Sequence, residues 1–303
     1  MMPTKSMHAT SKKRQPITVG KKQLHLPAGQ DMQLSTPVSH PGSVSILPPA
    51  DTLDTLRAQT ARFTVTMLDP WYNRGVGGVV EGYEEWIGVL LEEAARISDH
   101  IFLWGFPEIV CCALRRLPSN LKLTAWLTWY FKNCPSVIRG WRSAQMACLH
   151  FSSPGSKMYP EHFLNEAQLE KQAQGTLRYM PGPATVIETS LIIGFVGRKE
   201  QVGHPAQKPE AVYEPLFRMT TKPGDTVLDP MCGSGTTGSV ALSRGLHAVL
   251  CDSSEEYVRM TEKRLGIKRH HQNIGCEISR HMVRNRRPPK SFDEECKRVG
   301  RTR

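Results

Sequence analysis

The sequence is short of long apolar runs: no stretch of 18 apolar residues occurs, and the first residues are polar and basic. A transmembrane helix and a secretory signal core both need such a run, so neither is predicted. The eight cysteines include no pair at the C-x-x-C spacing, which argues against a zinc site or a disulfide framework. We therefore expect a cytoplasmic protein with reduced thiols, no membrane segment and no metal.

Acidic residues are scarce at both ends of the chain, whose net charge is +11. Residues 1–50 hold six Lys or Arg against one Asp, and residues 268–303 hold eleven against four acids. Basic segments rich in Pro, Ser and Gln bury little apolar surface, so we expect a disordered extension over 1–50 and a disordered tail over 268–303. Such tails can bind phosphates without reading a base sequence, or can simply keep the protein soluble.

Acidic residues are absent altogether from residues 109–160, where basic side chains are interleaved with aromatic ones. Cations beside aromatic rings suit the binding of a nucleic acid. A buried strand is the alternative for Trp129 and Phe131, and we favour it for these two. The side chains predicted to contact DNA are Arg115, Arg116, Lys132, Arg139, Trp141 and Arg142.

The most informative segment that is present, residues 226–237, joins an apolar strand to a glycine-rich loop and a helical stretch. Gly233 and Gly235 allow the backbone to approach a ligand, and a helix N-terminus offers N–H groups to an anionic end. The loop also fits G-x-G-x-x-G, with Asp252 in the place of the ribose-binding acid of dinucleotide enzymes. That fingerprint opens a series of βα units, but too few residues follow Gly238 to build them. A permuted α/β domain with a nucleotide-type cofactor is therefore favoured.

A second strand end with the same chemistry lies far upstream. The apolar residues 63–68 predict a buried strand, and Asp69, Pro70, Trp71 and Tyr72 follow it directly. Ligands of open α/β sheets bind at the carboxyl ends of the strands. A carboxylate beside an aromatic ring at such an end suits a planar base that carries an exocyclic amine.

The chain here resembles the beta-class DNA amino-methyltransferases, which modify adenine N6 or cytosine N4 with S-adenosylmethionine. The motif order of that family is Asp-Pro-Pro-Tyr, target recognition, His-Pro-x-Gln-Lys-Pro and then Asp-Pro-x-x-Gly-Ser-Gly-Thr. This sequence has the same order, with the first motif at 69–72, the second at 204–209 and the third at 229–236, and the resemblance spans about residues 60–267.

The resemblance implies roles for individual residues. It assigns Asp69, Pro70 and Tyr72 to catalysis on a base flipped out of double-stranded DNA. For His204 we favour a structural role over a catalytic one. The resemblance also implies a nucleoid-associated bacterial or phage-like enzyme. The residues that it places around S-adenosylmethionine are Lys208, Asp229, Pro230, Cys232, Gly233, Ser234, Gly235, Thr236 and Asp252.

One position departs from the family pattern, because Trp71 replaces its second proline. The family associates an Asp at the position of Asp69 with adenine N6, so adenine is favoured over cytosine N4. A decayed DNA-binding relative and an RNA or protein amino-methyltransferase are the remaining alternatives. The sequence leaves the oligomeric state open.

The predicted architecture is α/β, a permuted Rossmann-like methyltransferase sheet over 51–267 with an irregular insertion at 152–185 as the candidate target-recognition segment. Helices are predicted near 51–60, 84–96, 109–117, 209–219, 240–244 and 255–265. Strands are predicted at 63–68, 101–104, 123–131, 144–151, 189–196, 226–228 and 248–250.

Overall fold

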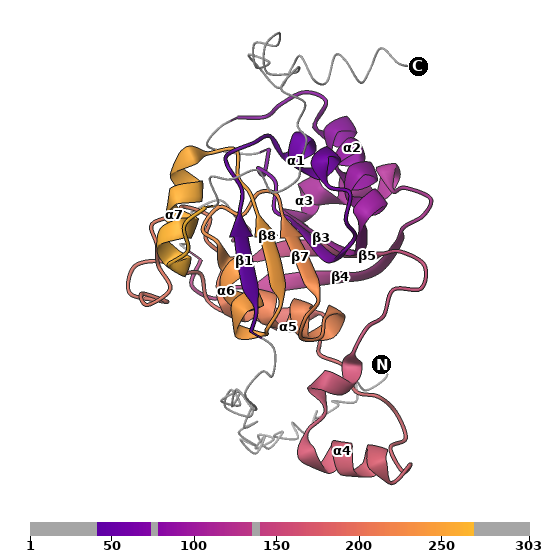
Figure 1. Cartoon of the computed structure of the whole chain (residues 1–303). Helices are drawn as coiled ribbons and strands as arrows, with labels where there is room; N and C mark the ends of the chain where they lie inside the picture. The colour runs from indigo at the N-terminus through magenta and orange to yellow at the C-terminus, as the bar shows by residue number, and fades with distance from the viewer. Residues whose placement is uncertain (1–40, 74–77, 135–139, 270–303) are drawn as a thin grey trace, which may run out of the picture. The chain divides into compact units, whose positions relative to one another are not determined.

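The computed structural model describes residues 41–73, 78–134 and 140–269, which form one eight-stranded sheet with helices packed against it (Figure 1). The strand order is β1-β8-β7-β2-β3-β5-β4-β6. The strands are β1 (Ser43–Ile46), β2 (Phe63–Leu68), β3 (Ser98–Gly105), β4 (Lys122–Tyr130), β5 (Gln145–Ser152), β6 (Val186–Glu188), β7 (Thr226–Asp229) and β8 (His247–Leu250).

Within the described ranges, β5 alone runs against the other strands. The carboxyl ends of the seven remaining strands therefore lie at one edge of the sheet, which we call the carboxyl edge. The cofactor-type loop after β7 and the Asp69 motif after β2 both leave from this edge, because β2 pairs with β7 in parallel. The permuted Rossmann-like prediction is confirmed at the level of the fold.

Two apolar clusters cover the two faces of the sheet. One cluster joins Leu56 of α1 (Thr52–Ala58) and Leu90 of α2 (Tyr83–Ile97) to the sheet residue Leu103. The other brings Phe217 of α5 (Glu210–Thr220), Ala241 of α6 (Thr236–Ser243) and further side chains against the opposite face. The remaining helical elements are α3 (Pro107–Val110), a 3-10 helix (Cys111–Arg116), a second 3-10 helix (Pro160–Phe163), α4 (Glu166–Ala173), α5 (Glu210–Thr220), α6 (Thr236–Ser243) and α7 (Glu255–Leu265).

Most predicted elements are found, but four predictions need correction. Strand β1 lies inside the predicted extension 1–50 and pairs with β8 at the sheet edge. The last edge strand is β6 at 186–188, not 189–196. The predicted helix 109–117 is a short α-helical turn followed by a 3-10 helix. The predicted irregular insertion contains helix α4, whose first turn is closed by a capping box between Asn165 and Gln168.

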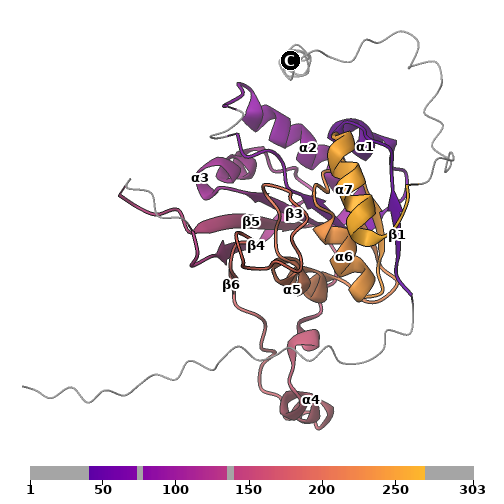
Figure 2. The same cartoon turned by 90° about the vertical axis from the view of Figure 1, so that its left-hand side faces the viewer.

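The insertion after β5 leaves from the sheet edge opposite to the carboxyl edge. The last residue of β5, Ser152, pairs with Lys122 at the start of β4. Farther along, the Tyr159 N–H donates to the Met219 carbonyl at 2.7 Å, near the end of α5. Figures 1 and 2 both show α4 projecting beyond α5, away from α7. The predicted target-recognition segment 152–185 is thus displaced from the strand ends that carry Asp69 and Asp229.

The described residues contain no helix long and apolar enough to cross a membrane. The same residues contain no group of three or more His, Cys, Asp or Glu side chains placed to hold a metal ion. Their six cysteines carry free thiols. The rest of the predicted extension and tail, residues 1–40 and 270–303, lie outside the described ranges.

Candidate active site

The Asp69 motif and the segment 204–209 meet at the carboxyl edge through a buried lysine. Lys208 Nζ donates to Asp69 Oδ2 and to the Tyr72 hydroxyl, the latter at 3.0 Å. The ammonium also lies 5.2 Å from the centre of the Trp104 ring on β3. Burial alone would lower the pKa of Lys208, but the Asp69 carboxylate and Tyr72 outweigh burial and raise that pKa above its ordinary value. The sequence analysis assigned Lys208 to the cofactor site, and in the structure the Lys208 side chain contacts the Asp69 motif.

Asp69 keeps one acceptor free for a further donor. Among the described residues its Oδ1 is buried and has no hydrogen-bond partner, while Oδ2 is taken by Lys208. Buried acceptors in folded proteins are nearly always satisfied, so an orphaned carboxylate oxygen points to a ligand that donates a hydrogen bond. The neighbouring Tyr72 ring packs edge-on against Phe106, with ring centres 5.3 Å apart. Burial, with the Asp69 charge, raises the pKa of Tyr72 to about 12, so the phenol stays neutral.

Trp71 is the residue at which this loop departs from the family pattern. The Trp71 side chain is 40% exposed, and its carbonyl accepts a hydrogen bond from the Tyr83 hydroxyl at 2.5 Å. Asn73 adopts a left-handed φ of 49° and accepts from the Val80 N–H at 2.6 Å. The loop that presents Tyr72 is therefore held by hydrogen bonds that involve the side chains of Tyr83 and Asn73, although the second proline of the family pattern is missing.

The loop after β7 forms a tight turn into helix α6. Gly235 is the N-cap of α6 with a φ of 75°, and a Cβ at this position would lie 2.9 Å from the Thr261 side chain. A side chain is thus excluded both by the backbone conformation and by the packing of α7. Among the described residues no side chain caps the first turn of α6, so its N–H groups can receive an anionic group.

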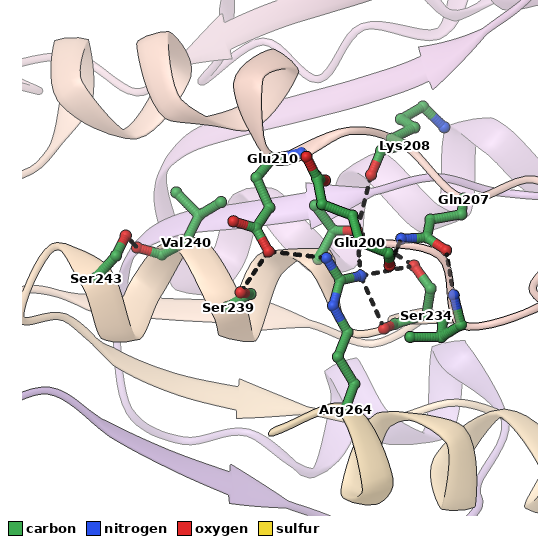
Figure 3. A network of polar contacts seen from close by, with 11 residues as sticks. Glu200, Gln207, Lys208, Glu210, Ser234, Ser239, Val240, Ser243 and Arg264 are labelled. Carbon is green, nitrogen blue, oxygen red and sulfur yellow. Dashed lines mark hydrogen bonds and ion pairs between the residues drawn. The ribbon is translucent and has the colours of Figure 1, made fainter. Parts of the chain in front are cut away.

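An arginine that the sequence analysis did not single out, and whose side chain is only 7% exposed, clamps this loop. Arg264 of α7 donates to the Ser234 carbonyl at 3.1 Å, to Thr236 Oγ1 at 3.0 Å and to Glu210 Oε1 at 2.9 Å. Figure 3 shows its guanidinium between Ser234 and Glu210. The Thr236 hydroxyl in turn donates to the Lys208 carbonyl at 2.9 Å. Lys208 therefore contacts the cofactor-type loop with its backbone and the Asp69 motif with its side chain.

The remaining predicted cofactor residues mostly stabilise the loop itself. Asp252 accepts from the Gly233 N–H at 2.9 Å with one oxygen and from the Ser254 N–H at 2.9 Å with the other. Each carboxylate oxygen can accept a second hydrogen bond, so a ribose hydroxyl is compatible with these contacts. Cys232 and Pro230 are buried beneath the turn.

His204 packs above the glycine turn. Its ring lies edge-on to Tyr257 with ring centres 4.4 Å apart, and a Cβ on Gly233 would lie 3.0 Å from His204 Nε2. Burial lowers the pKa of His204, which favours the neutral ring. These contacts agree with the predicted structural role.

Asp229 is fully enclosed at the end of β7. It accepts from the Met231 N–H at 3.1 Å and from the Thr237 hydroxyl, and burial, against these hydrogen bonds, raises the pKa of Asp229 to about 7. In the unfolded chain an Asp titrates near 3.9. Between about pH 4 and 7 the folded state therefore keeps a proton that the unfolded state has released.

This titration predicts a pH-dependent stability. The contribution of Asp229 is most favourable below about pH 4 and is lost as the pH rises to about 7. The melting temperature of Asp229→Asn, measured beside the wild type from pH 4.5 to 8, is expected to rise relative to the wild type as the pH increases. A difference that stays constant over this range would contradict the assigned titration.

The side chains predicted to bind DNA are divided between the carboxyl edge and the surface of α2. Trp141, 98% exposed, and Arg142 follow the carboxyl end of β4. Lys132 pairs with Glu188 at the ends of β4 and β6. Arg115 and Arg116 instead pair with acids of α2, at 2.5 Å to Glu84 and 2.7 Å to Glu85. Arg139 lies outside the described residues.

Comparison with known proteins settles the family. A family model described as DNA methylase, with N6 and N4 in its name, matches residues 65–263. The chain belongs to this DNA methylase family. The methylase is 30% identical over 216 residues to type II methyltransferase M.HpaI of Haemophilus parainfluenzae, covering 66% of this chain and 67% of that protein. It is 40% identical over 72 residues to DNA adenine methyltransferase YhdJ of Escherichia coli K12, which is 24% of each chain.

Solved structures agree with the fold. The M1.HpyAVI complex with S-adenosylmethionine superposes with a TM-score of 0.56 at 18% identity, covering 74% of the methylase and all of that chain. The cytosine-N4-specific PvuII DNA methyltransferase superposes with a TM-score of 0.55 at 15% identity, covering 87% and 95%. The methylase thus has the fold of the S-adenosylmethionine-dependent amino-methyltransferases.

Proposed function

We propose that the protein transfers a methyl group from S-adenosylmethionine to the exocyclic amine of a base flipped out of duplex DNA, and that the base is adenine. The observation that carries this proposal is the orphaned Asp69 Oδ1 beside Tyr72, at the edge where the glycine turn also lies. An amine inside a duplex is out of reach of such a recessed acceptor, so the nucleotide has to leave the stack.

The residues of this chain fit the cofactor of the family. Its carboxylate end suits the uncapped first turn of α6, and its ribose suits the free acceptor positions of Asp252. When bound, S-adenosylmethionine supplies an electrophilic methyl group. The turn of Gly233, Ser234 and Gly235 leads into this helix; His204 and Thr261 pack against its two glycines, and Arg264 holds its backbone in place.

On the acceptor side, the protein positions the amine. Tyr72 stacks on the extruded base, and Asp69 Oδ1 and the Pro70 carbonyl accept the two amine hydrogens, which orients the nitrogen lone pair towards the incoming methyl group. Positive charge develops on that nitrogen, and the fixed Asp69 carboxylate stabilises it. The methylated nitrogen is acidic, so its extra proton leaves to Asp69 or to water without a strong base. Holding the two reactants together supplies much of the remaining rate.

Adenine is favoured by Asp69 itself and by the relative named as an adenine methyltransferase. Cytosine N4 is the second candidate, since a cytosine-N4-specific enzyme shares the fold.

Labelled methyl transfer tests the proposal. The protein is incubated with S-adenosylmethionine labelled in the methyl group and with unmethylated duplex DNA, and the DNA is then digested to nucleosides. Label in N6-methyl-2′-deoxyadenosine supports the first choice, and label in N4-methyl-2′-deoxycytidine supports the second. Bound cofactor with no label in DNA would refute methylation of DNA and leave a catalytically decayed relative, or RNA or protein as the acceptor.

A further inference from the structure

The segment between β6 and α5, residues 189–209, runs along the carboxyl edge of the sheet. It starts at the end of β6, the outermost strand, and reaches Lys208 beside Asp69, which follows β2. Strands β4, β5 and β3 stand between these two points, and adjacent strands are about 4.8 Å apart. The segment must therefore pass along the carboxyl edge, by the carboxyl ends of β4 and β3 and the amino end of β5, and we call it the strap.

The strap is fastened at both ends. At its start, the Thr189 N–H donates to the Tyr130 carbonyl at 3.1 Å, and Asn133 exchanges two hydrogen bonds with the backbone of Leu191 at 2.7 and 2.9 Å. At its end, Lys208 binds Asp69 with its side chain and accepts from the Thr236 hydroxyl with its carbonyl at 2.9 Å. Gln207 closes the strap on itself, because it accepts from the Val202 N–H at 3.1 Å and donates to the Glu200 carbonyl at 2.6 Å.

The end of the strap is also joined to the cofactor side of the site. Glu200 accepts from the Glu210 N–H at 3.0 Å, and Glu210 pairs with Arg264, the arginine that clamps the glycine turn (Figure 3). The strap thus connects the ends of β4 and β6 with the loop that holds the cofactor.

Between the two fastenings, the strap presents its largest side chain to solvent. All residues from 193 to 199, the tip of the strap, are exposed, and Phe195 is 89% exposed. The tip nonetheless has internal order, because Gln201 Nε2 donates to the Gly194 and Val196 carbonyls at 3.3 Å each, and the Glu200 N–H donates to the Gly197 carbonyl at 2.8 Å. A loop whose backbone is fixed while its apolar residues face water is suited to contact a partner.

The charge of the tip identifies the chemistry of that partner. Phe195 is followed by Arg198 and Lys199, and the tip contains no acid. The neighbouring β4–β5 loop, which Asn133 ties to the strap, exposes Trp141 and Arg142. Two loops at one edge thus offer aromatic rings together with cations, the combination that stacks on bases and pairs with phosphates.

We propose that the tip of the strap is a DNA-contact surface, in which Phe195 packs against the bases of the duplex next to the extruded nucleotide and Arg198 and Lys199 bind the adjoining phosphates. Apolar side chains that enter a base stack help to hold the duplex open, so Phe195 would favour the flipped state. This inference rests on the proposed function. The sequence analysis predicted that residues 152–185 contact the DNA target. The inference assigns a contact with the target DNA to the tip of the strap instead.

The test compares Phe195→Ala with Tyr179→Ala, which removes another exposed ring, 75% exposed, from the segment that leaves the opposite edge. Loss of an aromatic contact to a base typically reduces affinity by about tenfold. We expect kcat/KM for unmethylated duplex DNA to fall by roughly tenfold or more in Phe195→Ala and to stay within about twofold of the wild type in Tyr179→Ala. Binding of S-adenosylmethionine and the melting temperature are expected to be unchanged in both variants.

The paired variant Arg198→Gln/Lys199→Gln tests the phosphate contacts. Its affinity for DNA should fall for every sequence, and its plot of log affinity against log salt should be shallower by about one to two units. Wild-type activity in Phe195→Ala, or a larger defect in Tyr179→Ala, would overturn the assignment to the strap. A wild-type protein that labels no DNA would instead overturn the proposed function itself, so the two failures are distinguishable.

Discussion

Replacing Asp69 by alanine is expected to reduce methyl transfer to DNA by at least about a hundredfold, while S-adenosylmethionine still binds. The variant removes the acceptor that faces the target amine, and losing one fixed group of this kind commonly costs a factor of 100 to 1000 in kcat. The cofactor-type loop does not depend on the lost carboxylate, because its own contacts come from Arg264, Asp252 and Thr261. Single-turnover transfer of labelled methyl groups and equilibrium binding of S-adenosylmethionine measure the two effects separately.

Two further variants support the interpretation of this experiment. Asp69→Asn keeps the shape of the side chain and an acceptor for Lys208, so a loss of rate in it cannot be attributed to an empty space. Asp99→Ala removes an exposed carboxylate from the start of β3, at the opposite edge, and should retain wild-type activity. Comparable rates for Asp69→Ala and the wild type would remove Asp69 from the mechanism.

Replacing Lys208 by methionine is expected to have the second large effect. Methionine keeps the apolar stem but leaves Asp69 without its counter-charge in a buried site, and breaking such a pair typically lowers stability by about 3–5 kcal/mol. We expect a lower melting temperature together with a loss of kcat that exceeds any change in KM for DNA. Lys222→Met, at an exposed position before β7, is the matched control and should change neither quantity.

A double-mutant cycle separates positioning from a general loss of structure. If Lys208 acts by orienting Asp69, the pair Asp69→Ala/Lys208→Met should be no slower than Asp69→Ala alone, since nothing remains to be oriented. The double variant should also be no less stable than Lys208→Met, because it contains neither of the two buried charges. Rate losses that multiply in the double variant would show that Lys208 acts independently of Asp69.

The two strand ends that carry the site were predictable because each has its own local pattern. An apolar run followed by Asp-Pro marks the ends of both β2 and β7, and parallel strands bring such ends to one edge. The bond from Lys208 to Asp69 was not predictable, because 139 residues separate the two in sequence. The role of Arg264 was hidden for the same reason: as one of two basic residues in the last turn of α7, it looks like an ordinary surface cation.

Two features that were predicted wrongly, helix α4 and the direction of the insertion after β5, do have signals in the sequence. Asn165 and Gln168 form the spacing of a capping box, which predicts the start of α4 inside a segment otherwise rich in Pro and Gly. The hairpin of β4 and β5 requires β5 to run backwards, which sends the following insertion to the far edge. Strand β1, by contrast, has four residues and no distinctive pattern, and its pairing with β8 defines it.

The order of the strands has a consequence for synthesis on the ribosome. β2 lies between β3 and β7 in the sheet, but β7 is synthesised about 160 residues after β2. The interval between β1 and its neighbour β8 is longer still. During most of translation one long side of β2 therefore lacks its hydrogen-bonded neighbour, and an unpaired apolar strand of this kind invites association with other nascent chains. Chaperone dependence and recovery of soluble protein should accordingly be sensitive to truncations that remove β7 and β8, even though the Asp69 motif is complete long before they appear.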